Sequence, residues 1–258
     1  MIIRERQDDI VMITQDNHAR IAGVFAANWK NSFFNSSKKR NSVELAINEH
    51  DRGWIPVDCT PFMNDQNSLP YTFMYFPTKP KLIFYKNGID EVEQMDNYAG
   101  ILCSHHYARF AANDSNEESQ AFVQHEENRQ RKLKEKVKEF DPESFQFHYD
   151  LLNFCDNLSL YVCLNEPGTA KVDEHQFYKS GIPIPTTFSF LGGDYSAIHW
   201  QNKQTVMLSD FPFEQPTWIE IKQKVVSKQK IIECGLVAAY KDAPIEIVPV
   251  SINKIPRS

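Results

Sequence analysis

The sequence predicts a mainly α-helical protein with a β-rich C-terminal part. Up to about residue 165, apolar side chains recur every three or four positions, which is the spacing of a helix with one buried face. After the turn sequence NEPG (165–168), short segments rich in β-branched residues alternate with turn residues, as strands do. We therefore expect a helical body at residues 1–165 and a β-rich extension at residues 166–258 packed on it.

The helical body is expected to begin after one short strand, IVMIT (10–14), and to contain a long irregular segment from Trp54 to about Pro80. Asp16 or Asn17 could cap the first helix, and Asn41 or Ser42 the second. The remaining elements follow from periodicity alone. Helices are expected at 15–30, 41–51, 81–95, 97–112, 118–140 and 142–165, and strands at 186–193, 197–200, 204–209, 218–226, 236–240 and 245–252.

The charge and composition of the chain argue against several classes of function. The chain of 258 residues has a net charge of −6, which argues against broad binding to nucleic acid or to an acidic membrane. Its one basic run, residues 129–138, is interrupted by Gln, Leu and Glu and indicates a solvated helix face. No segment has the ~18 continuous apolar residues of a membrane span. Five scattered cysteines suggest reduced thiols, and hence a cytoplasmic protein.

Several histidines and one aspartate fall on the apolar faces of the expected helices. His18 precedes Ile21 and Phe25 by three and seven positions, so it lies on the inward stripe of its helix. His50 follows Val43 by seven positions and also faces inward, with Asp51 directly after it. The residues three, four and seven positions away on the same helix face are apolar, so burial is the expectation for both histidines.

Three further helices carry residues of the same types. Asp156 stands in the middle of a buried stripe, and either His105 or His106 must face the core. His125 follows Phe122 by three positions on a helix that is otherwise crowded with charge. A single histidine on an apolar face is usually a hydrogen-bonded core residue, and a buried aspartate usually caps a helix or pairs with Arg or Lys. A divalent cation would explain the set together, because it binds neutral imidazoles and ionised carboxylates.

The order of these residues resembles the HD-domain superfamily of helical, metal-dependent phosphohydrolases, which is named for an adjacent His-Asp pair. The likeness is to members with two extra histidines between the pair and the last aspartate, including cyclic-dinucleotide phosphodiesterases and mixed-valent di-iron oxygenases related to inositol oxygenase. The segments ELAINEHDRGW (44–54) and LLNFCDNLSLYVCLNEPG (151–168) also resemble a family of bacterial proteins of uncharacterised function. The resemblance covers residues 10–165 and implies an HD-type helical bundle.

The resemblance also implies a dinuclear site for two divalent metal ions, with iron or manganese the expected metals. One ion would be held by His18, His50, Asp51 and Asp156. Asp51 would bridge to a second ion. That ion would be held by His105 or His106 together with His125.

One position departs from the superfamily pattern. Members often have a lysine three residues after the aspartate that contacts the substrate, and here that residue is Trp54. Arg52 lies beside the pair, but a helix would direct it elsewhere. Lys81 and Arg129 are candidate replacements, although surface positions are an alternative for both. Together with Asp51, these residues form the candidate catalytic group.

These observations support three hypotheses. The first is a hydrolase that cleaves a phosphoester with a metal-bound hydroxide. The second keeps the metal site but uses two irons for oxidative cleavage of a small hydroxylated compound, and the third is an inactive HD-type sensor or binding protein. In the first two the partner is a small-molecule substrate, with neither nucleic acid nor membrane involved. The β-rich part could close the pocket or pair edge strands in a homodimer.

Overall fold

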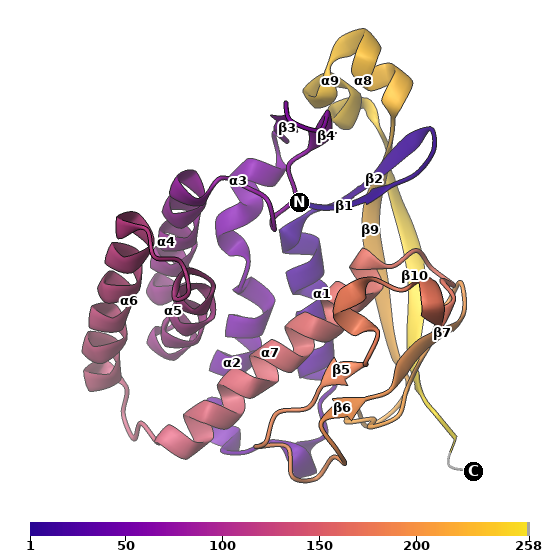
Figure 1. Ribbon diagram of the computed structural model, residues 1–258. Helices are drawn as coiled ribbons and strands as arrows, with labels where there is room; N and C mark the ends of the chain where they lie inside the picture. The colour runs from indigo at the N-terminus through magenta and orange to yellow at the C-terminus, as the bar shows by residue number, and fades with distance from the viewer. Residues whose placement is uncertain (257–258) are drawn as a thin grey trace.

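The computed structural model describes residues 1–256 and places a group of helices beside a six-stranded sheet (Figure 1). Within this range the fold is mixed α and β, so the prediction of a mainly α protein holds for the helical body alone. No helix in this range has the length and apolar character needed to cross a membrane. The long helices are α1 (Gln15–Ala27), α2 (Arg40–Glu49), α4 (Thr78–Met95), α5 (Asn97–Ala111), α6 (Glu117–Lys136) and α7 (Pro142–Leu164).

The helices agree with the sequence periodicity, and most of the differences lie at their ends. Thr14 caps α1, because its hydroxyl accepts a hydrogen bond from the backbone N–H of Asn17 at 3.1 Å. Neither Asp16 nor Asn17 is the capping residue. The second helix starts at Arg40 without a side-chain cap, one residue before the expected start. The irregular segment after it contains 3-10 helix η3 (Arg52–Trp54), the short helix α3 (Ile55–Asp58) and the hairpin β3 (Met63–Asn64)–β4 (Leu69–Pro70).

Gly53 has a packing role as well as being near the end of α2. A Cβ atom at this position would lie 2.2 Å from the backbone oxygen of Phe84, and one at Gly88 would lie 2.5 Å from the backbone nitrogen of Gly53. The absence of both side chains lets η3 and α4 approach backbone to backbone. This contact holds the segment that follows His50 and Asp51 against α4.

The sheet draws its strands from both ends of the chain. Its order is β1-β2-β9-β10-β8-β7, and all neighbours are antiparallel except β10 and β8. Residues 1–13 form two of the strands, so the sheet crosses the boundary expected at residue 165. The strands are β1 (Ile2–Glu5), β2 (Asp9–Ile13), β7 (Ile198–Asn202), β8 (Thr205–Leu208), β9 (Thr217–Ser227) and β10 (Ile245–Lys254).

Two segments of the C-terminal part differ from the prediction. Residues 236–240 were expected to form a strand, but they lie in helix α9 (Leu236–Asp242), which follows helix α8 (Lys228–Cys234). Leu236, Ala239 and Tyr240 are buried, which is the three-and-four spacing of a helix. Residues 186–193 contain no strand, and the nearby hairpin is β5 (Ile182–Pro183)–β6 (Tyr195–Ser196). The remaining 3-10 helices of the described residues are η1 (Asn31–Phe33), η2 (Ser37–Lys39), η4 (Lys171–Asp173) and η5 (Gln176–Tyr178).

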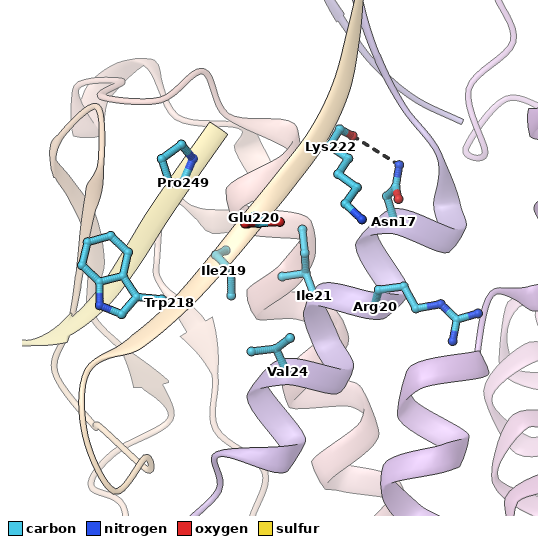
Figure 2. A pocket seen from close by; sticks show the side chains of 9 residues that line it. All are labelled: Asn17, Arg20, Ile21, Val24, Trp218, Ile219, Glu220, Lys222 and Pro249. Carbon is cyan, nitrogen blue, oxygen red and sulfur yellow. Dashed lines mark hydrogen bonds between the residues drawn. The ribbon is translucent and has the colours of Figure 1, made fainter. Parts of the chain in front are cut away.

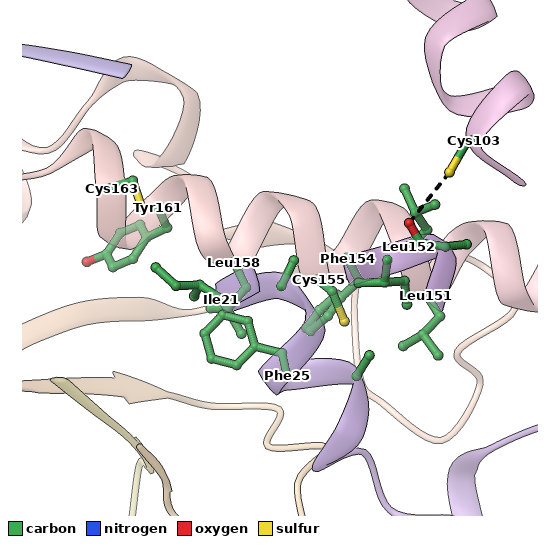
Figure 3. Packing of buried hydrophobic residues seen from close by; sticks show 14 of the residues in the cluster. Ile21, Phe25, Cys103, Leu151, Leu152, Phe154, Cys155, Leu158, Tyr161 and Cys163 are labelled. Carbon is green, nitrogen blue, oxygen red and sulfur yellow. Dashed lines mark hydrogen bonds between the residues drawn. The ribbon is translucent and has the colours of Figure 1, made fainter. Parts of the chain in front are cut away.

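Helix α1 joins the helices to the sheet. On one side, Ile21 and Phe25 lie alongside Leu158 and Cys155 of α7 in the main hydrophobic core (Figure 3). On the other side, α1 packs against β9, where the Asn17 side chain donates a hydrogen bond to the backbone oxygen of Lys222 (Figure 2). Strand residues such as Ile219 belong to the same core as the helices. The sheet therefore supports the helix that carries His18.

Candidate metal centre

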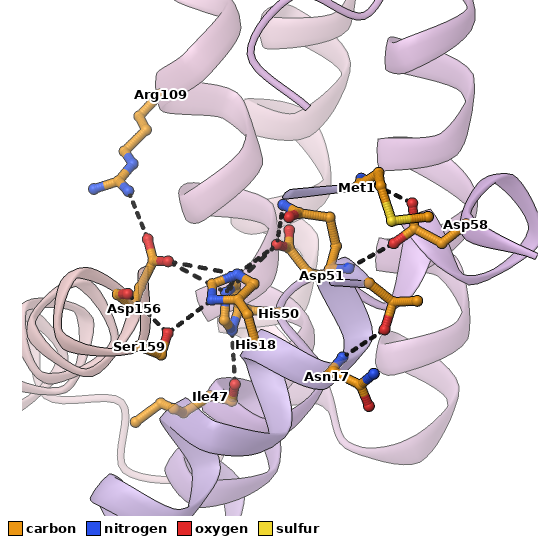
Figure 4. A network of polar contacts seen from close by, with 12 residues as sticks. Met1, Asn17, His18, Ile47, His50, Asp51, Asp58, Arg109, Asp156 and Ser159 are labelled. Carbon is orange, nitrogen blue, oxygen red and sulfur yellow. Dashed lines mark hydrogen bonds and ion pairs between the residues drawn. The ribbon is translucent and has the colours of Figure 1, made fainter. Parts of the chain in front are cut away.

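Four of the residues predicted as metal ligands meet at one buried point (Figure 4). His18 comes from α1, His50 and Asp51 follow α2, and Asp156 comes from α7. None of the four is more than 5% exposed. Three helices therefore bring together side chains that are far apart in the sequence, such as His18 and Asp156.

The polar atoms of these four side chains are within contact distance of one another. His18 Nε2 lies 2.8 Å from Asp51 Oδ2 and 3.2 Å from His50 Nε2. His50 Nε2 lies 3.5 Å from Asp156 Oδ1 and 3.8 Å from Asp51 Oδ2. His18 Nε2 lies 3.7 Å from Asp156 Oδ1. Two imidazole nitrogens and two carboxylates thus surround a common space.

The remaining hydrogen bonds decide which imidazole nitrogens face this space with a lone pair. His50 Nδ1 lies 2.7 Å from the backbone oxygen of Ile47, which can only accept, so Nδ1 carries the hydrogen. The Ser159 hydroxyl donates to the backbone oxygen of Asp156 at 2.8 Å and must therefore accept from His18 Nδ1, 2.7 Å away. In the neutral form of each ring, Nε2 is then an unprotonated ligand atom. Fixing the tautomer through the other ring nitrogen is typical of histidine ligands.

This arrangement requires a positive charge between the four groups. Two lone pairs 3.2 Å apart and two carboxylates would repel one another in a site from which water is excluded. Without a metal ion, a proton supplies that charge: although burial opposes it, Asp51 and Asp156 raise the pKa of His50 to about 9. The histidines in turn hold the pKa of the Asp51 and Asp156 carboxyls below the usual value, against the effect of burial.

Two side chains that the sequence did not single out hold the carboxylates in place. Gln15 Nε2 donates to Asp51 Oδ2 at 2.8 Å. Arg109 Nη2 donates to Asp156 Oδ2 at 3.3 Å, which leaves Oδ1 turned toward the histidines (Figure 4). Both partners contact the carboxylates from outside the cluster. Such contacts orient the ligands of a metal site.

Of the two adjacent histidines, only His106 lies beside the cluster. His106 is 2% exposed, and its ring centroid lies 4.9 Å from that of His50, so that His50, His106 and Asp156 form a second group able to hold an ion. Burial lowers the pKa of His106 well below its usual value and keeps the ring neutral. His105 instead packs against Phe145 and Tyr149.

The other predicted ligand lies elsewhere. The side chain of His125 is 53% exposed and lines a surface groove on α6, with Glu126 as its nearest acid at 3.8 Å. Arg129 lines the same groove and forms ion pairs with Asp90, Glu93 and Glu126. Neither residue belongs to the group around His50. The set that would hold a second metal ion is therefore not assembled as the resemblance implied.

Of the remaining candidate catalytic residues, one lies outside the pocket described below and two line it. Arg52 forms ion pairs with Glu49 at 2.9 Å and Glu91 at 2.5 Å and does not line the pocket described below. Trp54 and Lys81 do line that pocket. Trp54 is 1% exposed and packs edge-on against Phe76, so it forms an apolar wall.

A pocket of about 550 Å³ opens onto the candidate metal centre, which is formed by His18, His50, Asp51 and Asp156 and is called the metal centre below. This volume is within the range of small-molecule sites. His18, Asp51, His106 and Asp156 lie at its buried end, while exposed aromatic residues mark its mouth. Among the lining residues that the sequence did not single out are Gln15, Arg109 and Tyr178. Of these, Arg109 could have been found from its place one helical turn after His105 and His106.

Tyr178 belongs to η5 and reaches the pocket from the C-terminal part of the chain. It is 1% exposed, and its hydroxyl has no hydrogen-bond partner among the described residues 1–256. Burial, helped by the charge of Asp156, raises the pKa of this phenol well above its usual value. The hydroxyl therefore stays protonated and able to donate. No sequence pattern marks this tyrosine, because the segment around it has no regular periodicity.

Comparison with known proteins identifies the family of the chain. Residues 1–228 match the sequence model of the family described as "Protein of unknown function (DUF3891)". The chain belongs to this family. The matched range includes every residue of the metal centre and of the pocket. No curated protein and no solved structure shows significant similarity to the chain.

Proposed function

We propose that the protein is a phosphoester hydrolase that depends on a divalent metal ion bound by His18, His50, Asp51 and Asp156. One observation supports this above the others: two imidazole lone pairs and two carboxylates converge on one space, where a metal ion can supply the positive charge that a proton on His50 otherwise provides. Mixed nitrogen and oxygen ligands of this kind suit manganese, iron or zinc.

The donor set favours one ion in this site. Two triads of possible ligands, His18–His50–Asp51 and His50–His106–Asp156, share His50, so these five side chains surround one place. The proposal therefore departs from the dinuclear arrangement expected from the resemblance, because His125 lies on the surface of α6.

When bound, a divalent ion would polarise a phosphoryl oxygen and lower the pKa of a water molecule. The residues of the chain bind the substrate, orient the metal ligands and exclude water from the site. Gln15 and Arg109 fix the carboxylates of Asp51 and Asp156, so their oxygens need no rearrangement during the reaction. Trp54 and Tyr85 wall the site with apolar surface. Lys81 and Arg109 provide positive charge for an anionic substrate.

The cations in the pocket also favour hydrolysis over oxidation. A phosphoester carries negative charge, which Lys81 and Arg109 would stabilise in the partly desolvated pocket. Oxidative cleavage at a di-iron centre would need a second set of ligands, and the histidine implied for it is His125. We therefore rank the oxygenase below the hydrolase.

The test is metal analysis combined with an assay of phosphoester cleavage. Purified protein would be treated with a chelator, loaded with Mn²⁺, Fe²⁺ or Zn²⁺, and given p-nitrophenyl phosphate and bis(p-nitrophenyl) phosphate. We expect about one ion per chain and cleavage that the chelator removes. The variant Asp156→Asn should lose both properties, and Lys86→Gln, a surface change on α4, should lose neither.

The alternative functions give other results. Oxygen consumption with two irons per chain would favour the oxygenase. A bound metal ion without turnover of either ester or consumption of oxygen would favour a binding protein. Failure to bind any of the three metals would reject the proposed function.

A further inference from the structure

The pocket above the candidate metal centre is lined by three donors, none of which is itself a proposed metal ligand. Lys81 (α4) makes no ion pair within residues 1–256, and burial lowers its pKa against the distant attraction of Asp114. Arg109 (α5) contacts Asp156 through Nη2 and Asn153 through Nη1, while its Nε has no partner in this range. The buried hydroxyl of Tyr178 (η5) has none either. A lysine, an arginine and a phenol that line one pocket are suited to an anionic group.

The mouth of the same pocket is aromatic. Tyr75, Phe110 and Phe177 line it and are 70%, 50% and 52% exposed. They come from the segment before α4, from the end of α5 and from η5. Large apolar side chains exposed to water and grouped at the entrance of a concave site are typical of a binding surface. A planar apolar group would cover them and gain dispersion and stacking contacts.

We propose that Lys81, Arg109 and Tyr178 hold the anionic group of the substrate over the metal centre, while Tyr75, Phe110 and Phe177 bind a planar, apolar group at the mouth. The inference rests on the proposed function and adds the substrate class, an aryl or similarly flat phosphoester. It also gives the part of the chain after residue 165 a role. Phe177 and Tyr178 come from η5, so this segment contributes one residue to each half of the substrate site.

Two phosphonates that cannot be hydrolysed test the two halves separately. Phenylphosphonate carries both groups, and methylphosphonate carries the anion without the ring. Their affinities would be measured by calorimetry with the full chain, once loaded with Mn²⁺ and once after chelation. We expect phenylphosphonate to bind about tenfold more tightly, since a buried ring adds roughly 1.5 kcal/mol and 1.4 kcal/mol corresponds to tenfold.

Substitutions assign the donors and the aromatic mouth. Lys81→Gln should weaken both probes about tenfold, and Tyr178→Phe about threefold, because each loses a hydrogen bond to the anion. Phe177→Ser should weaken phenylphosphonate alone. Lys86→Gln and Trp218→Ser are matched controls on exposed surface outside the pocket and should change neither affinity. Thermal unfolding of each variant checks that the fold is retained.

Each half of the inference can be overturned. Equal affinity for the two phosphonates, or an unchanged preference in Phe177→Ser, would reject the aromatic mouth. Unchanged binding in both Lys81→Gln and Tyr178→Phe would reject the anion site. A protein that binds metal but shows neither effect would leave the proposed hydrolase standing without this substrate class. A protein that prefers phenylphosphonate but binds no metal would reject the hydrolase and keep the pocket.

Discussion

The metal centre and the charged groove on α6 are built from similar residues but balance their charge in different ways. In the groove, Arg129 pairs with Asp90, with Glu93 and with the fully buried Glu126. One guanidinium with five donors thus contacts three carboxylates, and Lys86 adds a second cation beside Asp90 at 2.7 Å. In the metal centre, Asp51 faces only imidazoles and the neutral Gln15. Arg109 contacts only one of the two carboxylate oxygens of Asp156, the outer one. The inner carboxylate oxygens there have no permanent cation.

This difference separates a structural charge cluster from a candidate binding site. Permanent cations complete the groove, so it needs nothing further. The candidate metal centre would be completed by a proton on His50 or by a metal ion, which would compete for the same lone pair. A histidine next to an acidic residue is therefore informative only when the charge of its surroundings is known. The predictions below test this contrast, beginning with the largest expected effect.

Removing a carboxylate should lower the affinity for Mn²⁺ in the metal centre but not in the groove. Asp51→Asn takes away a ligand atom, and we expect the affinity for Mn²⁺ to fall by on the order of a hundredfold or more. Asp90→Asn removes the same charge from the groove and should leave the affinity unchanged. Metal titration followed by calorimetry measures both. Equal affinities in the two variants would contradict the assignment of the metal centre.

Removing the cation of the groove should affect stability rather than metal binding. Arg129→Met leaves the buried Glu126 without its guanidinium, and we expect the free energy of unfolding to fall by about 2–4 kcal/mol. Urea denaturation measures this change, and metal analysis should still give the wild-type content. A parallel loss of metal would show that the groove and the metal centre are coupled.

The stability of the metal-free protein should depend on pH through His50. The pKa of His50 is raised from 6.5 to about 9 by Asp51 and Asp156, so its contribution is complete below pH 6.5 and is lost as the pH rises through 9. The carboxyls of Asp51 and Asp156 have lowered pKa values, so their contribution is lost toward acid, below their ordinary value of 3.8. We expect the alkaline loss to be on the order of 1–3 kcal/mol.

Thermal unfolding between pH 6 and 9 measures this loss. Saturating Mn²⁺ should reverse the trend, because the metal binds the deprotonated ring and stabilises the fold more as the pH rises. His50→Gln should flatten both profiles. An alkaline loss that persists unchanged in this variant would assign the titration to another group.

The smallest effect is expected at His125. Because its side chain is 53% exposed, His125→Ala should change the free energy of unfolding by less than about 0.5 kcal/mol and leave metal content as it is. Denaturation and metal analysis of this variant are the measurements. A fall from two ions per chain to one would restore the dinuclear arrangement implied by the resemblance.

Helix periodicity predicted the inward faces of α1, α2 and α7, and on these faces the structure brings His18, His50 and Asp156 together. The same reasoning could not exclude His125, because it follows Phe122 by three positions and most of the buried residues of α6 are polar. The buried stripe of α6 runs through Ser119, Phe122, Glu126, Gln130 and Leu133, and His125 lies beside it. Adjacent residues such as His105 and His106 differ by about 100° around a helix, and either could have faced the core. The packing of α5 against its neighbours decides in favour of His106.

The features that the sequence did not reveal depend on contacts between distant segments. Tyr178 enters the pocket from an irregular segment, where no periodicity relates a residue to a face. Strand β2 was expected from its composition, but its position in the sheet depends on pairing with β9, more than 200 residues later. Residues 236–240 combine branched and small apolar side chains, so the burial of every third or fourth one, rather than composition, identifies the helix α9.

The pairing of β2 with β9 has a consequence for how the protein forms. Asp9 pairs with Ser227, so closing this part of the sheet brings together residues that are far apart along the chain. Contacts of such long range form slowly, since the entropy of the intervening loop is lost before the contact stabilises anything. Helix α1 packs against β9 and carries His18 (Figure 2). During synthesis, the helices can therefore collapse early, whereas α1 reaches its supported position only after β9 has left the ribosome.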